Sequence, residues 1–273
     1  MVRQVGQDAR GIVALEAGLA HFRLHRYPPS PDVGRFVDRY WVVSWDLRGR
    51  PAHTQQVLAH PVVNVVFMDG TAIAHGVKRR IDSRTLSEAG RVLGVMFRPA
   101  GFRPFLAGPA SAITDQEIVL AEIFGPAADG LTERVHAAAD GEEMAAEADR
   151  FLASVVPSAP QPSEATTAVA ERAAADPRWS GWTRWRPGRG VGVRQLQRRF
   201  SDHVGISAKA LIRRYRLYEA AEQARLRHDI DWADLAAQLS YSDQAHLSRE
   251  FNALLGMPPR QYALACRALR RPV

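Results

Sequence analysis

Two short segments of the chain combine hydrogen-bonding side chains with a matched pair of apolar residues. In the first segment Leu196 and Phe200 lie four residues apart and therefore share one helix face, whereas Arg194, Gln197 and Arg198 fall elsewhere on the helix. Arginine and glutamine side chains donate hydrogen bonds. The segment therefore predicts a helix with one face for a core and another for a polar partner.

The second segment repeats the same spacing further along the chain. Leu247 and Phe251 follow the first pair at an offset of 51 residues (247 − 196). A short helix opening at Asp231 precedes them, a turn through Ser240 and Tyr241 joins the two helices, and Ser242 is the expected N-cap of the second helix. Helix, tight turn and helix form the unit whose second helix enters the major groove of DNA.

Longer helices are expected around these two segments. Ser163 is a suitable N-cap for a helix over residues 163–175, and Ser207 for a helix over the following 20 residues, AKALIRRYRLYEAAEQARLR. At 1.5 Å per residue the second of these would be a rod of roughly 30 Å. It lies between the two segments and would set their separation.

The positive charge of the chain is concentrated after the Pro/Ser stretch 157–163. Of the net charge of +7, residues before Ser163 contribute 17 − 18 = −1 and those from Ser163 onward 19 − 11 = +8. A region with this excess of positive charge is typical of proteins that bind a polyanion, although solubility alone would also explain the charge. The stretch predicts a linker between a domain at residues 1–156 and another at residues 164–273.

Cysteine usage and hydropathy exclude several classes of protein. Cys266 is the single cysteine, so the chain forms no intramolecular disulfide and no thiol-held cluster. No window reaches the roughly 18 apolar residues that a membrane span needs. A cytoplasmic protein without a membrane partner is expected.

The order of the C-terminal motifs resembles one family. RQLQRRF, VGISAKALIRRYRL, LSYSDQAHLSREF and LGMPPRQYA, within residues 163–265, resemble the DNA-binding domain of AraC/XylS-type transcription regulators. The resemblance implies two helix-turn-helix units on one long helix, with their reading helices about one duplex turn, roughly 34 Å, apart. It thus implies a sequence-specific regulator that reads two successive major-groove segments.

The resemblance also assigns roles by position. Arginine can pair with guanine, glutamine with adenine, and an alanine methyl can touch a thymine methyl. Ser201, Ser248 and Arg213 are expected at phosphates, which fix the register on DNA. For His246 a role as a partly exposed spacer is an equal alternative. The expected base-edge residues are Arg194, Gln197, Arg198, Gln244, Ala245, His246 and Arg249.

Residues 179–190 depart from the family pattern. The helix before the first reading helix should stand here, yet Pro187 costs a helix about 3 kcal/mol and Gly188 roughly 1 kcal/mol. Read one base upstream, the stretch accommodates Val-Asp-Ala-Leu-Ala-Ala-Arg-Ala-Gly, which would suit that helix. We interpret the stretch as a pair of compensating frame slips, either an artefact or a real loss of the first supporting helix.

The N-terminal part predicts a β-rich domain. Short apolar runs alternate with turn residues over 22–107, and residues 115–156 are expected to be helical. The predicted fold class is α+β: an antiparallel β-barrel or sandwich-like domain, then an all-α domain with two helix-turn-helix units joined by a long helix. RYWVVSWDL, HPVVNVVF and VLGVMFRPAGFRPFL resemble a small β-rich domain of unknown function that precedes many such DNA-binding units.

The same domain is expected to sense a small molecule or to mediate dimerisation. His53, His60 and His75 do not have the His-x-His spacing of a cupin metal site, so no metal or other cofactor is expected. Aromatic side chains in such a domain are more often plain core. The candidate effector-binding residues are Trp41, Trp45, Phe67, Phe97, Arg98 and Arg103.

The sequence is compatible with three candidate functions. A sequence-specific regulator is favoured, and its expected partners are double-stranded DNA, a small-molecule effector, a second copy of the chain and, for an activator, RNA polymerase. The alternative is a ligand-binding or scaffold protein with a degenerate first helix-turn-helix and weak DNA binding. An alkyl-transfer enzyme would need a nucleophilic cysteine in its own domain, whereas Cys266 lies near the end of the chain. No enzymatic activity is therefore expected.

Overall fold

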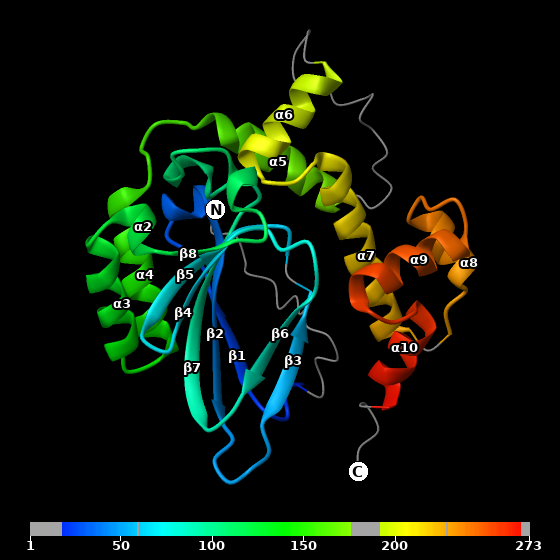
Figure 1. The fold of residues 1–273 in the computed structure, drawn as a ribbon, viewed down its shortest axis with the longest axis horizontal. Coiled ribbons are helices and arrows are strands. Elements are labelled where there is room, and N and C mark those ends of the chain that lie inside the picture. The colour runs from blue at the N-terminus through cyan, green and yellow to red at the C-terminus, as the bar shows by residue number, and fades with distance from the viewer. Residues whose placement is uncertain (1–17, 59, 176–191, 228, 269–273) are drawn as a thin grey trace.

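The computed structural model describes residues 18–58, 60–175, 192–227 and 229–268. Within these ranges, strands, three α-helices and three short 3-10 helices make up the N-terminal part, and six α-helices form the C-terminal part beside it (Figure 1). Within the described ranges, no helix is both long and apolar enough to span a bilayer.

The strands form two antiparallel sheets. The larger sheet has the order β1-β2-β7-β4-β5-β8, and the smaller sheet pairs β3 with β6. In the described residues β1 and β8 stand at opposite edges, so the larger sheet is open and does not close into a barrel. The strands are β1 (Arg23–Tyr27), β2 (Val37–Asp46), β3 (His53–Val57), β4 (Asn64–Met68), β5 (Thr71–His75), β6 (Asp82–Leu86), β7 (Ala89–Phe97) and β8 (Glu117–Val119).

Strand alternation gives the larger sheet two different faces. Tyr40, Val65 and Val95 are in register across β2, β4 and β7, and all three are buried in one core. The next residues along, Trp41 and Gly94, are paired in the same ladder and therefore point to the opposite face. One face of the larger sheet therefore packs in this core, and the opposite face lies outside it.

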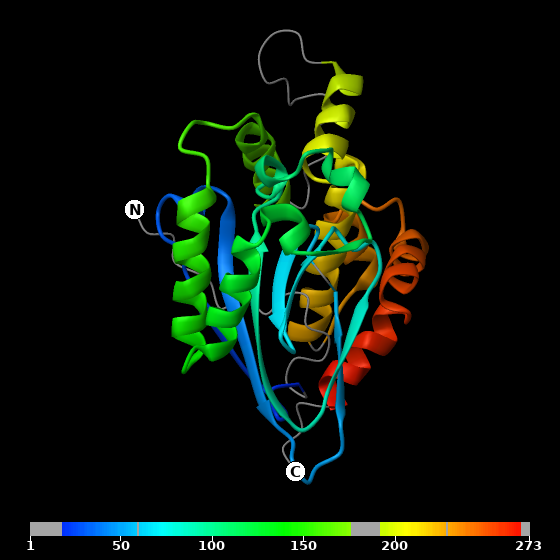
Figure 2. The same ribbon diagram turned by 60° about the vertical axis from the view of Figure 1, so that its left-hand side comes forward.

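Helices cover the first of these faces. The helices α2 (Ala121–Phe124), α3 (Ala127–Ala137) and α4 (Gly141–Val155) lie against the larger sheet, on the side away from β3 and β6 (Figures 1 and 2). Asp140 caps α4 by accepting a 2.9 Å hydrogen bond from the backbone N–H of Glu143.

The helical part begins later than the sequence indicated. Helix was expected from residue 115, but Glu117–Val119 form strand β8, in which Val119 pairs with Ile73 of β5. Three residues are too few for a periodic pattern, and the open edge of β5 offers them backbone partners. The prediction of an antiparallel β domain followed by a helical domain is confirmed.

Six helices make up the C-terminal part of the described chain. Ser207 caps α7 by accepting from the backbone N–H of Ala210 at 3.2 Å, and Asp231 caps α8. Ser163 is not the cap of α5: it lies inside the helix, with a buried hydroxyl that has no hydrogen-bond partner in the described structure. The helices are α5 (Pro162–Ala175), α6 (Val193–His203), α7 (Ala208–Leu226), α8 (Trp232–Gln238), α9 (Gln244–Leu255) and α10 (Pro259–Ala268).

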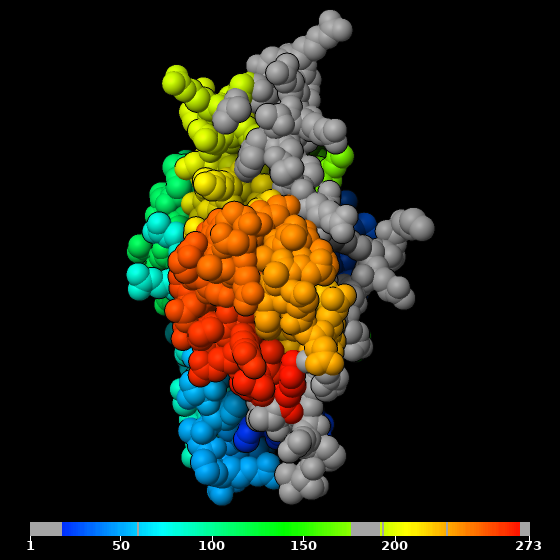
Figure 3. All heavy atoms as spheres, turned by 90° about the vertical axis from the view of Figure 1, so that its right-hand side faces the viewer, coloured from blue at the N-terminus to red at the C-terminus, as the bar shows by residue number. Residues whose placement is uncertain are grey.

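The long helix α7 joins two small cores. Leu196 and Phe200 of α6 pack with α5 residues around the start of α7, and Leu247 and Phe251 of α9 pack with α8 and α10 around its end. All four apolar side chains are almost fully buried, as their spacing predicted. From the side of α7, the helices α8 to α10 cover the middle of the molecule, above the β3 end of the N-terminal domain (Figure 3).

Candidate nucleic-acid interface and cavity

Helix α6 turns polar side chains toward solvent. Its apolar residues are buried, and Arg194, Gln197, Arg198 and Ser201 are exposed. No side chain caps the helix, because Gly192 stands at its N-terminal cap. The four predicted residues of this unit therefore share one accessible helix and are free to meet a partner.

Helix α9 is organised in the same way, and unlike α6 it has a side chain that caps its N-terminus. Asp243, not the neighbouring Ser242, is the cap, and its carboxylate accepts a 2.6 Å hydrogen bond from the backbone N–H of His246. That hydrogen bond lowers the pKa of Asp243, so the cap is ionised at neutral pH. Gln244, Ala245 and Arg249 are exposed on this helix, and Ser248 is half-buried.

His246 is held within its own unit. Its ring packs edge-on against Tyr241 at 5.2 Å, and Nδ1 lies 3.1 Å from the Ser242 hydroxyl. Its Nε2 lies 3.6 Å from a carboxylate oxygen of Glu250. The His246 ring is therefore held by three residues of its own unit.

Arg213 connects the long helix to the second unit. Its guanidinium lies 3.3 Å from the Glu250 carboxylate, and its side chain is 56% exposed. An exposed ion pair of this kind is worth little, so a phosphate can compete for the arginine. The Arg213 side chain is therefore accessible from solvent although it is paired.

The turn of the second unit contains one residue with a strained backbone conformation. Ser240 has φ +58°, in the left-handed region that favours glycine. The first unit cannot be compared on this point, since residues 179–190 lie outside the described residues.

The N-terminal domain is docked on the first unit. Arg98 makes two hydrogen bonds, of 2.7 and 2.6 Å, to the Glu171 carboxylate of α5, and Arg103 lies 3.0 Å from Asp202 of α6. At the turn after α6, the Thr114 hydroxyl donates a 2.7 Å hydrogen bond to the carbonyl of Gly205. Both predicted arginines thus lie between the domains.

The long helix touches the N-terminal domain as well. The side chain of Arg214 is buried in α7 and donates hydrogen bonds to the carbonyl oxygens of Lys78 and Arg79 at 3.1 and 2.7 Å. One turn later, Tyr218 stacks on His60 with ring centres 4.8 Å apart. The helix that carries both units is therefore held by the segments that follow β3 and β5.

A cavity of about 300 Å³ lies between the two sheets. Its walls are the free face of the larger sheet, the inner face of β3 and β6, and the segments that touch α7. Most of the lining is apolar, which is typical of a small-molecule site. Apolar lining residues include Leu24, Trp41, Val43, Val57, Leu58, Val66, Met68, Ile73, Leu86, Val92 and Met96.

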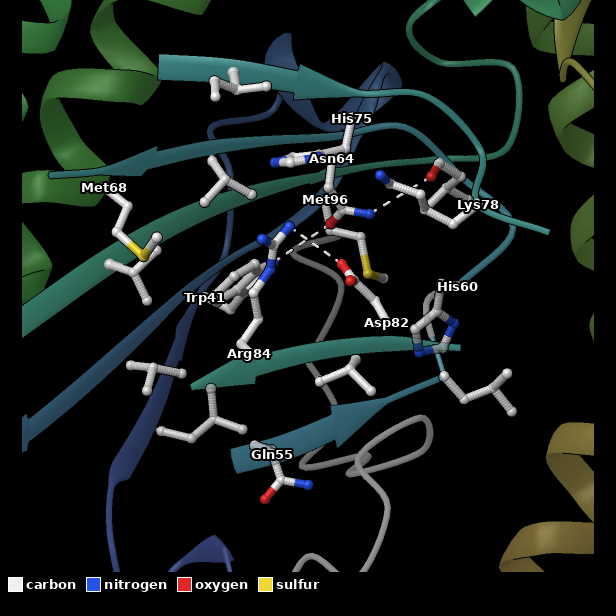
Figure 4. A pocket seen from close by; sticks show the side chains of 18 of the residues that line it. Trp41, Gln55, His60, Asn64, Met68, His75, Lys78, Asp82, Arg84 and Met96 are labelled. Atoms are coloured by element: carbon white, nitrogen blue, oxygen red, sulfur yellow. Dashed lines mark hydrogen bonds and ion pairs between the residues drawn. The ribbon is translucent and has the colours of Figure 1, made fainter. Parts of the chain in front are cut away.

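Polar side chains gather at one end of the cavity (Figure 4). The Glu117 carboxylate lies 2.7 Å from the Lys78 ammonium and 3.1 Å from Nδ1 of His75, and Arg84 lies 3.1 Å from Asp82. The hydrogen bond from Lys78 holds the pKa of Glu117 below its usual value, while burial lowers the pKa of His75. At neutral pH Glu117 is therefore ionised and the His75 imidazole is neutral.

The indole of Trp41 occupies the place of a missing side chain. A Cβ at Gly94 would come within 1.9 Å of the ring, so the ring lies directly against the backbone of β7. Its Nε1 donates to the Asn64 side-chain oxygen at 3.4 Å. The ring forms part of the cavity wall because Gly94 leaves room for it.

The six candidate effector residues occupy three different places. Trp41 lines the cavity, and Trp45 lies further along the same strand, with its ring against Gly90. Phe67 and Phe97 lie on the opposite face, in the core under the helices. Arg98 and Arg103 stand between the domains, as described above.

The polar end was missed at the sequence level. Asn64, Val66 and Met68 alternate along β4 with residues of the other face, and Asp82, Arg84 and Leu86 alternate along β6. That period of two was a usable signal. His53, His60 and His75 lie apart: His53 stacks on His21 at 4.2 Å, and in the described residues no three potential ligands gather as a metal site requires.

Two domain families match the chain. Residues 25–119 match a domain of unknown function, DUF6597, and residues 189–265 match a helix-turn-helix domain. No curated protein matches the sequence.

Solved structures of ToxT from Vibrio cholerae are similar in outline. One at 1.65 Å resolution has 11% identity and a TM-score of 0.40, covering 90% of this chain and 98% of ToxT. Another, bound to (E)-4-(8-methylnaphthalen-1-yl)but-3-enoic acid, has 11% identity and a TM-score of 0.39, covering 90% of this chain and 99% of ToxT. Likeness at this level carries no argument about what the present chain binds.

Proposed function

We propose that the chain, a DNA-binding transcription regulator with an AraC-type helix-turn-helix domain behind a DUF6597 domain, reads two successive major-groove segments under control of a small molecule. Such domains belong to a non-enzymatic class of protein. We also place its action in the cytoplasm, where DNA is accessible to it.

One observation carries the proposal of two reading helices. Both α6 and α9 bury a Leu-x-x-x-Phe pair and turn arginine and glutamine side chains outward, and both pack on α7. Since α7 has 19 residues, it is about 28 Å long at 1.5 Å per residue, near the rise of one duplex turn. A single chain could thus reach two adjacent grooves.

Different residues should serve specificity and affinity. Arg194, Gln197 and Arg198 in α6, and Gln244 and Arg249 in α9, have the donors that base edges accept. Residues proposed for phosphates or for apolar and packing contacts are Ser201, Arg213, Ser248, Ala245 and His246.

Control through the N-terminal domain is supported by its contacts. The cavity walls include Leu58 and Lys78, whose carbonyl oxygens accept hydrogen bonds from α7. A ligand that changes these walls would change the support of the long helix. A second copy of the chain, and RNA polymerase for an activator, complete the proposed partners.

A gel-shift titration with the intergenic DNA beside the coding region tests the proposal. Arg249→Ala should weaken specific binding by about 5- to 150-fold, equivalent to 1–3 kcal/mol, and relax the preference at one base pair. Arg213→Ala should weaken binding to all sequences alike and reduce the salt slope by about 1. Arg150→Ala, at an exposed position of α4, is the control and should change neither.

Equal affinity for the intergenic fragment and for bulk DNA would refute sequence-specific regulation. Footprinting separates the second candidate function, a ligand-binding protein with a degenerate first unit. Two protected segments support paired reading, whereas protection at the α9 segment alone would favour that second candidate. The departure of residues 179–190 from the family pattern is the observation in its favour.

A further inference from the structure

The cavity is long, and charged side chains gather at one end of it. Asn64 and Met68 mark opposite ends of β4, so about 13 Å of strand, at 3.3 Å per residue, separates the polar end from the apolar end. Figure 4 shows Asn64, His75 and Lys78 at one end and Met68 at the other. A ligand that fills the cavity therefore needs an extended apolar body.

The charged side chains of the polar end are paired with one another. The Lys78 ammonium lies 2.7 Å from the Glu117 carboxylate, and the Arg84 guanidinium lies 3.1 Å from the Asp82 carboxylate. Each pair joins one cation to one anion inside the lining. A charged ligand would therefore have to compete with an ion pair that is already formed.

The two other arginines of the lining are engaged as well. Arg39 lies 2.7 Å from the carboxylate of Asp38, which stands outside the lining. Arg26 also has an interaction of its own. These arginines therefore give no reason to expect an acidic ligand.

We propose that this cavity binds a neutral, mostly apolar molecule whose body lies along Trp41, between the two sheets. A charged ligand would lose hydration on entry and would meet charges that are already matched. A neutral ligand loses less hydration, and burial of its body against the apolar walls stabilises the complex. The indole, lying against the β7 backbone at Gly94, offers a flat wall that suits an aromatic body.

A neutral polar group on the ligand can still be bound at the polar end. An ammonium has three donors, so Lys78 can donate to a ligand carbonyl and keep its pair with Glu117. A hydrogen bond of this kind leaves the balance of charge at the polar end unchanged. An uncharged amide is therefore a suitable polar group for a test ligand.

The same site would govern the long helix. Leu58 and His60 line the cavity and touch Tyr218, while Lys78 lines it and accepts a hydrogen bond from Arg214. A ligand in the cavity thus contacts segments that α7 holds on their other side. This regulatory role rests on the proposed function, but ligand binding itself does not.

Calorimetric titration of the full chain without DNA tests the class of ligand. Three probes share one biphenyl body and differ in the charge of the polar group: biphenyl-4-carboxamide, biphenyl-4-carboxylate and biphenyl-4-methylamine. The carboxamide should bind at least tenfold more tightly than either ion. Failure of the carboxamide to bind, or binding of either ion at equal or higher affinity, would overturn the proposal.

Two variants of one ion pair test whether matched charges are the cause. Asp82→Asn leaves Arg84 without its acid and should strengthen binding of the carboxylate at least threefold, whereas Arg84→Gln should do the same for the amine. Arg48→Gln, at an exposed ion pair outside the cavity, is the control and should change neither. Unchanged affinities of both ions in both variants would overturn the role given to the ion pairs.

A further variant tests the position of the apolar body. Val66→Phe places a ring inside the cavity from β4 and should abolish binding of the carboxamide. Unchanged circular dichroism and thermal unfolding would show that each variant is folded. Undiminished binding to the folded Val66→Phe protein would overturn the site. Because no DNA is present, loss of DNA binding cannot produce any of these results.

Discussion

The hydroxyl of Tyr218, on the long helix α7, donates a 2.6 Å hydrogen bond to the carbonyl oxygen of Leu58, in the wall of the cavity. Both residues are almost fully buried. The long helix that joins the two C-terminal cores is therefore hydrogen-bonded directly to the domain proposed to hold a ligand. A change in the position of either residue therefore alters the hydrogen bond of the other.

Replacing Tyr218 by phenylalanine should cost about 1–3 kcal/mol of unfolding free energy in urea, because the Leu58 carbonyl then stays buried without its donor. The stacked ring on His60 is kept. Ligand affinity should be preserved, while the effect of ligand on DNA affinity should shrink. Tyr262→Phe, a buried tyrosine of α10, is the matched control: it should destabilise the chain without altering that effect.

Gly205 should tolerate alanine worse than Gly256 does. Both have positive φ, +94° and +73°, but a Cβ at Gly205 would lie 2.8 Å from the Thr114 hydroxyl and 2.9 Å from the Ala110 carbonyl, while a Cβ at Gly256 meets nothing. We expect a loss of roughly 2–4 kcal/mol for Gly205→Ala and about 1–2 kcal/mol for Gly256→Ala in chemical unfolding. Equal losses would mean that the domains are not in contact at this turn.

Ser240→Gly should stabilise the second unit by up to about 1 kcal/mol, since glycine adopts φ +58° without the strain that serine bears there. The comparison variant is Ala237→Gly, at an exposed position of α8 with ordinary helix geometry, which should lose about 1 kcal/mol. Differential scanning calorimetry should show melting temperatures that move in opposite directions. A lower melting temperature for Ser240→Gly would contradict the strain.

Stability should depend on the protonation of His203. Burial lowers the pKa of this imidazole, an effect that Asp202 opposes and Arg103 and Arg199 reinforce. The folded chain therefore binds the proton less well than the unfolded chain, and stability falls as the pH drops below the unfolded value of about 6.5 and levels off below the folded pKa. In His203→Gln the unfolding free energy should fall less between pH 7.5 and pH 5.

The sequence was sufficient to predict helices α6 and α9 and their buried faces, because the signals for these features are local. Leu196 with Phe200, and Leu247 with Phe251, define a buried face within one turn of helix, and the structure buries all four. Cap positions are also local, but two adjacent residues can compete for one cap. Asp243, rather than Ser242, is the N-cap of α9 because its carboxylate accepts the hydrogen bond from the His246 N–H.

The cavity could not be assigned in the same way. Along β4, Val66 and Phe67 are both apolar, and composition does not say which face of the sheet helices will cover. Alternation separates the two faces, but only the packing of α3 and α4 shows that Phe67 lies in the core and that Val66 faces the cavity. Arg98 and Arg103 find their partners in α5 and α6, about 70 and 100 residues away, which no local pattern reveals.

Gly94 determines how much space the cavity has. The residue itself does not line the cavity, yet the Trp41 ring can lie flat against the β7 backbone only because Gly94 has no side chain. A methyl group added at Gly94 would displace the Trp41 indole into the cavity. The space left for a ligand would then shrink, while the charged end of the cavity would not change. Ligand size and ligand charge are thus encoded at separate positions, so selectivity for one could be re-engineered while the other is kept.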